Sequence, residues 1–456
     1  MRNCEACMRV NKLEAEVEEA AEKLKQLIAT LQNAKREMNY HHCSVVKKLP
    51  PELLSTIFES FVSDALSPTL PQDGGVFEAL QHQVLPIPLI LSNVCHRWRE
   101  VAISTPRIWT ILALSLDLSW RSPRADLARA WVSRTRNHAL TVHIYSSLTS
   151  DYRSSSPDPS VFPILQILAA ASGQWARFYF RIPISTLHYL GTHMQHTRLL
   201  ETLAISLNSP LVHVPSFANP LWRAVTTLTV ANIETEDCIK MVSCAPNLVT
   251  CHFEEIVATN LDEQSWHIGK PVIEHNKIQH FTYDSEESYY VFTRLKLPNL
   301  RRLRITCTCP YDDEDMSTVF PIFIKNSGLE KLEVLQLLDN FAPHDLDSAL
   351  STIPSIKDFR LTYSDNYFVI FLLEHLAKTA LIDPSRAFLP NLTSSLKYIG
   401  QISDFHGPWY QRFFSIEPLI RLIRARTLRT NTIPVIALYR LLKFTWLTTT
   451  PIGRHS

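Results

Sequence analysis

The chain has 456 residues, and its 45 lysines and arginines nearly balance its 44 aspartates and glutamates, so the formal net charge is +1. A chain of this length can hold about three domains, but it has no overall positive charge to attract nucleic acid. Only 9 residues are glycine, and the phosphate-binding loops GxGxxG and GxxxxGKS/T do not occur. The composition therefore excludes broad nucleic-acid binding and the common nucleotide-binding folds, while 46% apolar residues exclude wholesale disorder.

The sequence contains no recognisable targeting segment. Its first residues lack the apolar stretch of a secretory signal, and the most apolar stretches, residues 84–94 and 367–377, are too short to cross a bilayer. The 9 cysteines, an odd number, predict reduced thiols. We therefore expect an intracellular protein, cytoplasmic, nuclear or both, whose partners include neither membranes nor nucleic acid.

After a tail over residues 1–9, residues 10–39 predict a coiled-coil-like amphipathic helix. Its apolar residues alternate spacings of three and four, as a coiled-coil seam requires. They are Val10, Leu13, Val17, Ala20, Leu24, Leu27, Leu31, Ala34 and Met38. Two interpretations stay open: a coiled coil that pairs two copies through residues 10–38 or docks on a partner, and a helix folded back on its own chain.

Zinc-type ligands flank this helix. Cys4 and Cys7 precede it, and His41, His42 and Cys43 follow it. A helix of that length would hold the two groups about 40 Å apart, too far to share one metal ion. We therefore expect no metal site here, and nothing else in the sequence indicates a cofactor.

Residues 45–110 predict a helical hairpin interrupted by an insertion over residues 62–86. Leu49-Pro50-Pro51-Glu52 signals a helix start, because proline in the first turn loses no hydrogen bond and the glutamate complements the helix dipole. The following helix has an apolar face too wide for a solvated helix. A second apolar stripe includes Leu91, Val94, Cys95, Trp98 and Ala102. Two such helices can pack together and still leave apolar surface for a partner.

These residues resemble the F-box. The family pattern is matched by Leu49-Pro50-Pro51-Glu52, Leu54-Ser55-Thr56-Ile57-Phe58, Val94-Cys95-His96-Arg97-Trp98-Arg99 and Pro106-Arg107-Ile108-Trp109. The resemblance implies docking on the Skp-type adaptor of a cullin-RING ubiquitin ligase, and through the adaptor on a cullin. It places adaptor binding on Leu49, Pro50, Leu53, Leu54, Ile57, Phe58, Leu91, Val94, Cys95 and Trp98. The sequence departs from the family in its insertion, which resembles those of expanded fungal F-box families.

After a connecting segment over residues 111–174, an apolar-x-x-apolar-x-apolar triplet recurs at intervals of 22 to 30 residues. Its copies begin at Trp175, Leu200, Val225, Leu248, Ile278, Leu300, Leu329 and Ile356. Four prolines, at positions 246, 298, 354 and 390, lie just before extended segments and predict the end of a helix there.

A repeat of one helix and one strand at this spacing predicts an α/β leucine-rich-repeat-like solenoid over residues 175–456. The expected fold is thus a mainly helical N-terminal part followed by that solenoid. The predicted solenoid resembles the repeats of fungal F-box proteins. The alternative is an irregular α/β domain whose units do not stack as a solenoid.

The resulting hypothesis is a non-catalytic substrate-recognition subunit of an SCF-type ubiquitin ligase. In this hypothesis the repeat domain binds an unknown target protein, with Arg301, Arg302, Arg304, Lys331 and Glu333 among the outward candidates. An F-box-like interaction scaffold that acts outside any ligase is the alternative. We expect no enzymatic activity, because no GxSxG, HExxH or other constellation of nucleophile and base is recognisable.

Overall fold

The computed structural model describes residues 5–42, 49–66, 86–116, 124–146, 161–182, 184–194, 197–207, 222–257, 271–285, 290–307, 313–338, 350–363, 395–401 and 442–447. The chain divides into two compact units. The first consists of Met1–Ala65 and Ile87–Thr105, and the second of Leu66–Pro86 and Pro106–Ser456.

The described part of the first unit is helical. Helix α1 (Glu5–His42) confirms the predicted N-terminal helix and extends beyond both of its expected ends. Three shorter helices follow: α3 (Pro51–Leu66), α5 (Ile87–Ser92) and α6 (His96–Ser104).

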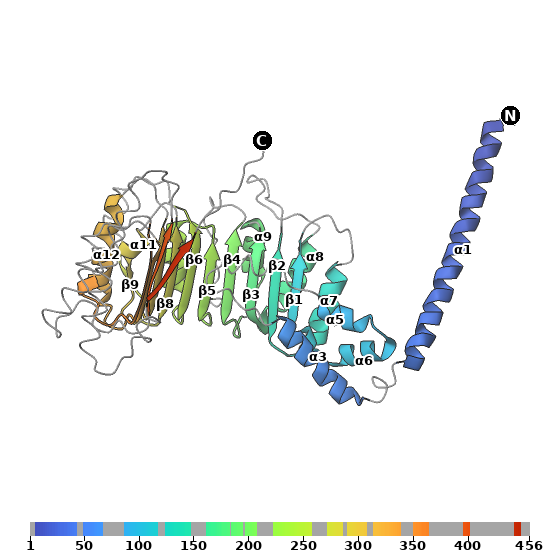
Figure 1. Ribbon diagram of the computed structural model, residues 1–456, viewed down its shortest axis with the longest axis horizontal. Helices are drawn as coiled ribbons and strands as arrows, with labels where there is room; N and C mark the ends of the chain where they lie inside the picture. Colours follow the sequence, from blue (N-terminus) through green and yellow to red (C-terminus); the bar gives the residue numbers. More distant parts are fainter. Residues whose placement is uncertain are drawn as a thin grey trace. The chain divides into compact units, whose positions relative to one another are not determined.

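The second unit is built on a parallel β-sheet (Figure 1). Within the described residues this sheet has 12 strands. The order of the strands in the sheet is their order along the chain, and all neighbouring strands are parallel. Its strands are β1 (Ile111–Ser115), β2 (Leu140–Tyr145), β3 (Trp175–Ile182), β4 (Thr202–Leu207), β5 (Thr227–Ala231), β6 (Thr250–Ile256), β8 (His280–Ser285), β10 (Arg302–Cys307), β11 (Val334–Leu338), β12 (Asp358–Tyr363), β13 (Ser395–Gln401) and β14 (Leu442–Leu447). Strands β7 (Ile273–Glu274) and β9 (Leu295–Lys296) form a separate parallel pair.

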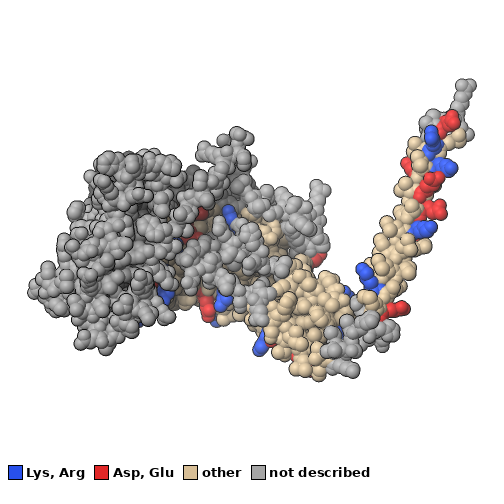
Figure 2. Space-filling model, viewed as in Figure 1, with Lys and Arg blue, Asp and Glu red and all other residues tan. Residues whose placement is uncertain are grey.

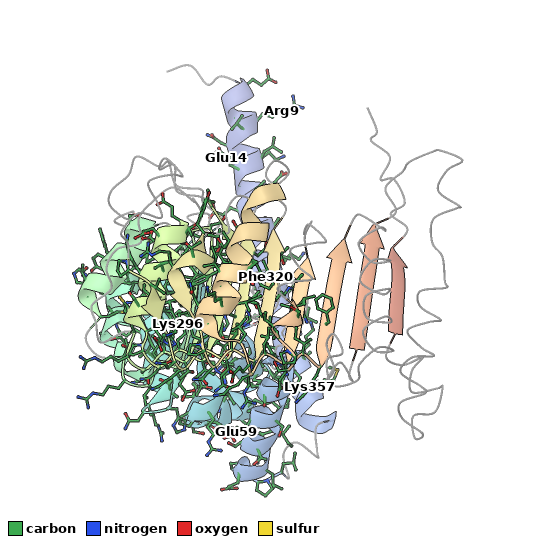
Figure 3. All side chains as sticks on the ribbon, turned by 90° about the vertical axis from the view of Figure 1, so that its left-hand side faces the viewer. Arg9, Glu14, Glu59, Lys296, Phe320 and Lys357 are labelled. Atoms are coloured by element: carbon green, nitrogen blue, oxygen red, sulfur yellow. The ribbon has the colours of Figure 1, made fainter. Side chains whose placement is uncertain are left out.

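Helices connect many of these strands, because a parallel pairing needs a crossover between strand ends. They are α7 (Arg124–Thr135), α8 (Phe162–Ala170), α9 (Ile184–His193), α10 (Thr235–Cys244), α11 (Val291–Arg294) and α12 (Asp313–Ser327), with the short 3-10 helices η1 (Pro106–Trp109) and η3 (Ser172–Gln174). Successive helices pack against one another, as α7 does on α8 and α11 on α12. Phe320, labelled on α12 in Figure 3, is buried.

The core of this unit lies on one face of the sheet. Phe281 and Tyr283 of β8 are buried, and they align with Leu303 and Ile305 of β10, which are buried too. The residues between them are partly exposed and polar. Strands β4 and β5 depart from this alternation, because nearly all of their residues are buried.

The predicted fold class is wrong. The helical N-terminal part fits, but we also expected a connecting segment over residues 111–174 and a leucine-rich-repeat-like solenoid from residue 175. The structure instead has one all-parallel α/β sheet that already begins with β1 and β2 inside the supposed connecting segment. Successive strands of this sheet begin from 22 to 47 residues apart, so no fixed repeat length holds.

The error has a physical origin at Trp109. Its position completes the F-box-like pattern in the sequence, and that pattern predicts that the helical region ends after it. In the structure Trp109 is buried in η1, directly before β1, and its ring lies edge-on to that of Trp131 at 4.8 Å. It therefore belongs to the second unit, and its apolar spacing to Leu112 and Leu114 is that of a strand entry.

The turns before the strands explain the recurring proline motif. Asn299 follows Pro298, and its side-chain amide donates to the backbone carbonyl of Asn276, at 2.7 Å. Ser355 follows Pro354, and its hydroxyl donates to the carbonyl of Leu332, at 2.8 Å. These side chains therefore link the turn before one strand to the turn before the preceding strand by a hydrogen bond. The copy at residues 389–392 lies outside the described residues.

Candidate functional site

Helix α3 begins where the sequence predicts a helix start. Pro51 is its first residue, and the Leu54 amide donates to the carbonyl of Pro50, at 3.1 Å. Glu52 lies in the first turn, where a negative charge favours the helix dipole. The helix ends at Leu66, within the predicted insertion, and residues 67–85 lie outside the described part of the chain.

The second predicted helix of the hairpin is broken into two. Helix α5 ends at Ser92, whose hydroxyl donates to the carbonyl of Pro88, and the Asn93 amide side chain donates to that of Leu89. Cys95 then adopts an extended conformation, and its sulfur accepts a hydrogen bond from the Trp98 amide at the start of α6. Side chains that bond to nearby backbone compete with a continuous helix, which accounts for the break.

One apolar core joins the three short helices. Its buried members are Leu54, Phe58, Val62, Ile87, Leu91, Val101 and Ala102. The Phe58 and Trp98 rings meet edge-on, with centroids 5.0 Å apart, an arrangement that adds to the free energy of burial.

Three polar contacts fix the helices further. The hydroxyls of Ser55 and Thr105 are 2.8 Å apart, and the Arg99 side chain donates to the carbonyl of Ser92, at 2.9 Å. The Arg97 guanidinium donates to the carbonyl of Leu49. The unit therefore presents its surface side chains on a packed support.

The same helices leave large apolar side chains in solvent. Leu53, Ile57 and Phe61 follow one another at spacings of four along α3, and their exposed fractions are 53%, 50% and 52%. We call these three residues the apolar row of α3. Ile90, Val94 and Ile103 of the same unit are exposed as well. Around α3, α5 and α6 the surface visible in Figure 2 carries few charged side chains. Several large apolar side chains exposed on one unit are typical of an interaction site.

The structure divides the ten predicted adaptor-binding residues into two groups. Leu54, Phe58 and Leu91 are buried and hold the helices together. The other seven reach the surface: Pro50, Leu53, Ile57, Val94 and Cys95 are exposed, and Leu49 and Trp98 are partly exposed. Sequence reasoning omitted Phe61 from the set, although its spacing of four from Ile57 was a signal. It also missed Ile90 and Ile103, for which no pattern in the sequence gave a signal.

The second unit offers a different surface, the polar face of its sheet. One row of aligned positions crosses the strands through His143, Tyr179, His252, Arg304 and Arg360, among others. Between Tyr179 and His252 it passes through Ala204 and Thr229, which are buried. The rings of His143 and Tyr179 are stacked, with centroids 4.7 Å apart. This row combines rings and guanidinium groups, which can contact a protein by stacking and by hydrogen bonds.

Burial keeps the histidines of this face neutral. It lowers the pKa of His143 to about 4. It also lowers the pKa of His252 to about 4, with smaller contributions from the charges of His280 and Arg304. The pKa of Tyr179 is raised by burial. At neutral pH the positive charge of this row therefore comes from its arginines.

The five outward candidates for target binding have different surroundings. Arg304 lies on β10 between the buried Leu303 and Ile305, Arg302 is the exposed first residue of the strand, and Arg301 directly precedes it. Lys331 and Glu333 already have partners, because Lys331 donates to the Asn299 side chain and Glu333 is 3.1 Å from the Lys357 ammonium group. That lysine, labelled in Figure 3, also lowers the pKa of Glu333.

Helix α1 is continuous between the two groups of zinc-type ligands. In the part of the chain that the structure describes, no cluster of three or more potential metal ligands occurs. Over the same residues, no helix has both the length and the hydropathy needed to cross a bilayer.

Comparison with protein families and with curated proteins finds no match for this sequence.

Proposed function

We propose that this chain is the non-catalytic substrate-recognition subunit of an SCF-type ubiquitin ligase in the cytoplasm, the nucleus or both. In this proposal, helices α3, α5 and α6 bind a Skp-type adaptor, which links the chain to a cullin. The observation that carries the proposal is the exposed apolar row of α3 within a sequence that resembles the F-box.

In this proposal, burial of the apolar row contributes to the free energy of adaptor binding. Leu53, Ile57 and Phe61 are each about half exposed. Completing the burial of one such side chain contributes roughly 1 kcal/mol, half the value for a fully exposed one. A partner that covers all three residues together with Val94 would therefore gain on the order of 4 kcal/mol from them before ordering costs.

Burial decides which of the predicted residues act directly. We assign adaptor contact to the apolar row and to the surface residues Pro50, Val94 and Cys95, with Leu49 and Trp98 at its border. Leu54, Phe58 and Leu91 act indirectly, because they fix the helices on which those contacts depend.

We assign target binding to the polar face of the sheet in the second unit. Its arginines and stacked rings would recognise a protein surface by shape and hydrogen bonds. The chain would then contribute proximity and no chemistry: binding both target and adaptor raises the effective concentration of target lysines near the ubiquitin-charged enzyme.

A matched pair of variants tests the docking surface. Ile57→Asp places a charge in the apolar row, and Thr56→Asp places the same charge on the neighbouring exposed residue, about 100° around the helix. Binding of the purified full chain to a purified Skp-type adaptor is measured by titration calorimetry. We expect Ile57→Asp to weaken binding by roughly tenfold or more and Thr56→Asp by less than about threefold.

The stability of the variants serves as the internal check. Thr56→Asp should change the free energy of unfolding by less than about 0.5 kcal/mol, and Ile57→Asp should cost about 1 kcal/mol, because half of the Ile57 side chain is already buried in the free chain. If the wild-type chain does not bind the adaptor, or if Ile57→Asp binds as tightly as the wild type, the proposal is wrong. Absence of adaptor binding together with capture of other proteins would favour the scaffold that acts outside a ligase.

A further inference from the structure

Helix α1 is a long amphipathic helix whose described side chains are exposed. All of its described side chains from Met8 to Met38 are exposed. Its seven large seam residues are between 53% and 68% exposed: Val10, Leu13, Val17, Leu24, Leu27, Leu31 and Met38. A helix in water owes most of its stability to the burial of such a stripe.

We infer that a second copy of this chain covers the stripe, and that the two α1 helices pair in antiparallel orientation as a two-stranded coiled coil. The seam residues occupy heptad positions a (Val10, Val17, Leu24, Leu31, Met38) and d (Leu13, Ala20, Leu27, Ala34). In an antiparallel pair, each a residue faces a d residue of the other helix, position e flanks e, and position g flanks g.

The alanines of the seam favour this orientation. In a parallel pair Ala20 would face Ala20 of the second copy, and Ala34 would face Ala34, leaving two poorly filled layers. In the antiparallel register that sets Val10 opposite Ala34, Leu24 lies opposite Ala20. Both seam alanines, Ala20 and Ala34, then face a larger apolar residue, which fills the layer.

Helix α1 has an acidic segment followed by a basic segment, so two copies in antiparallel orientation place opposite charges side by side. Between Glu14 and Glu22 all five charged residues are acidic, and between Lys23 and Arg36 all four are basic. Figure 2 shows acidic side chains gathered on the N-terminal half of α1. Two helices running in opposite directions therefore bring each acidic half beside the basic half of the other, which is electrostatically favourable.

The residues at heptad positions e and g, which flank the seam, also favour the antiparallel orientation. In the antiparallel register Glu14 (e) lies beside Lys35 (e) of the second copy and Glu16 (g) beside Lys23 (g), and symmetry repeats both pairs. Ile28, an exposed residue at position e, lies beside Ala21. In a parallel pair the favourable contact would be Arg9 with Glu14, two residues that both project from α1 in Figure 3.

A charge-swap cycle in the full chain separates the two orientations. The dissociation constant of the dimer is measured by sedimentation over a wide range of concentrations for the wild type, Glu14→Lys, Lys35→Glu and the double variant. In the antiparallel dimer each single variant replaces two attractive pairs by two repulsive ones, and we expect dissociation constants raised roughly tenfold. The double variant restores both pairs and should return to the wild-type value.

Two further variants complete the test. Arg36→Glu makes the same charge change as Lys35→Glu at position f, away from the seam, and should change the dissociation constant by less than about twofold. Leu24→Asp should abolish the dimer, because it places a charge in an apolar layer.

Three outcomes would overturn the inference. One is a wild-type chain that stays monomeric at every concentration, which would assign the stripe to a different partner. Another is a dimer that survives Leu24→Asp, since its interface would lie elsewhere. The last is a parallel pattern, in which Lys35→Glu has no effect while Glu14→Lys weakens the dimer and the double variant does not restore it.

Discussion

Acidification will destabilise the second unit, because the polar face of its sheet holds two histidines in the neutral form. The pKa values of His143 and His252 are lowered from 6.5 to about 4 by burial. In the unfolded chain both rings take up protons as the pH falls below about 6.5, while in the folded chain they do not until about pH 4. Their contribution to stability is therefore complete above pH 6.5 and is lost between 6.5 and 4.

The magnitude follows from the size of the two shifts. Each pKa unit corresponds to about 1.4 kcal/mol, so a shift of about 2.5 units sets an upper limit near 3.4 kcal/mol for each ring. Neither ring is completely buried, and we therefore halve this value. Between about pH 6.5 and pH 4 the two histidines together should lower the free energy of unfolding by roughly 3 kcal/mol.

The assay compares urea unfolding, followed by tryptophan fluorescence, at several pH values. His143→Phe keeps an aromatic ring against Tyr179, and His252→Gln keeps a polar side chain, but neither can take up a proton. The double variant should lose less stability than the wild type on acidification. His138→Gln, at an exposed position, should behave as the wild type. Equal pH dependence of the wild type and the double variant would show that His143 and His252 do not cause the loss of stability.

Three single substitutions test other parts of the second unit by thermal or urea unfolding. Asn299→Ala removes the side-chain bond to the Asn276 carbonyl and should cost about 1 kcal/mol; no loss would show that the proline motif acts only as a turn. Trp131→Phe leaves the buried carbonyl of Trp109 without its 2.7 Å donor and should cost about 2 kcal/mol, whereas an unchanged midpoint would mean that water replaces the donor. Gly328→Ala should cost about 1 kcal/mol because the backbone φ is +57°, and a stabilised variant would contradict this conformational argument.

Local elements could be predicted where one strong physical rule determines them. The seam of α1 and the start of α3 at Pro51 followed from periodicity and from the chemistry of proline. The break between α5 and α6 could not be predicted, because the apolar stripe continues across it. It depends on the side chains of Ser92 and Asn93, whose bonds to the preceding turn are alternatives that the sequence permits without requiring.

The fold class was missed because apolar spacing identifies strands but not the sheet to which they belong. Seven of the eight triplets from Trp175 onward lie at strands of the sheet, while the triplet at Leu329 lies three residues before the aligned positions of β11. Strand β1 carries no predicted triplet, because Trp109 also fits the F-box pattern. The candidate site shows a similar limit. A wide apolar face on α3 was readable, but only packing shows that Phe58 is in the core while Ile57 is exposed.

Whether the apolar row of α3 recruits a cullin-RING ligase is tested most directly by affinity purification of the full chain at its native level, with mass spectrometry of the bound proteins. We expect a Skp-type adaptor and a cullin both to be recovered with the wild type and both to be lost with the double variant Ile57→Asp, Phe61→Asp. Recovery of neither protein with the wild type, or equal recovery with the double variant, would contradict the proposal.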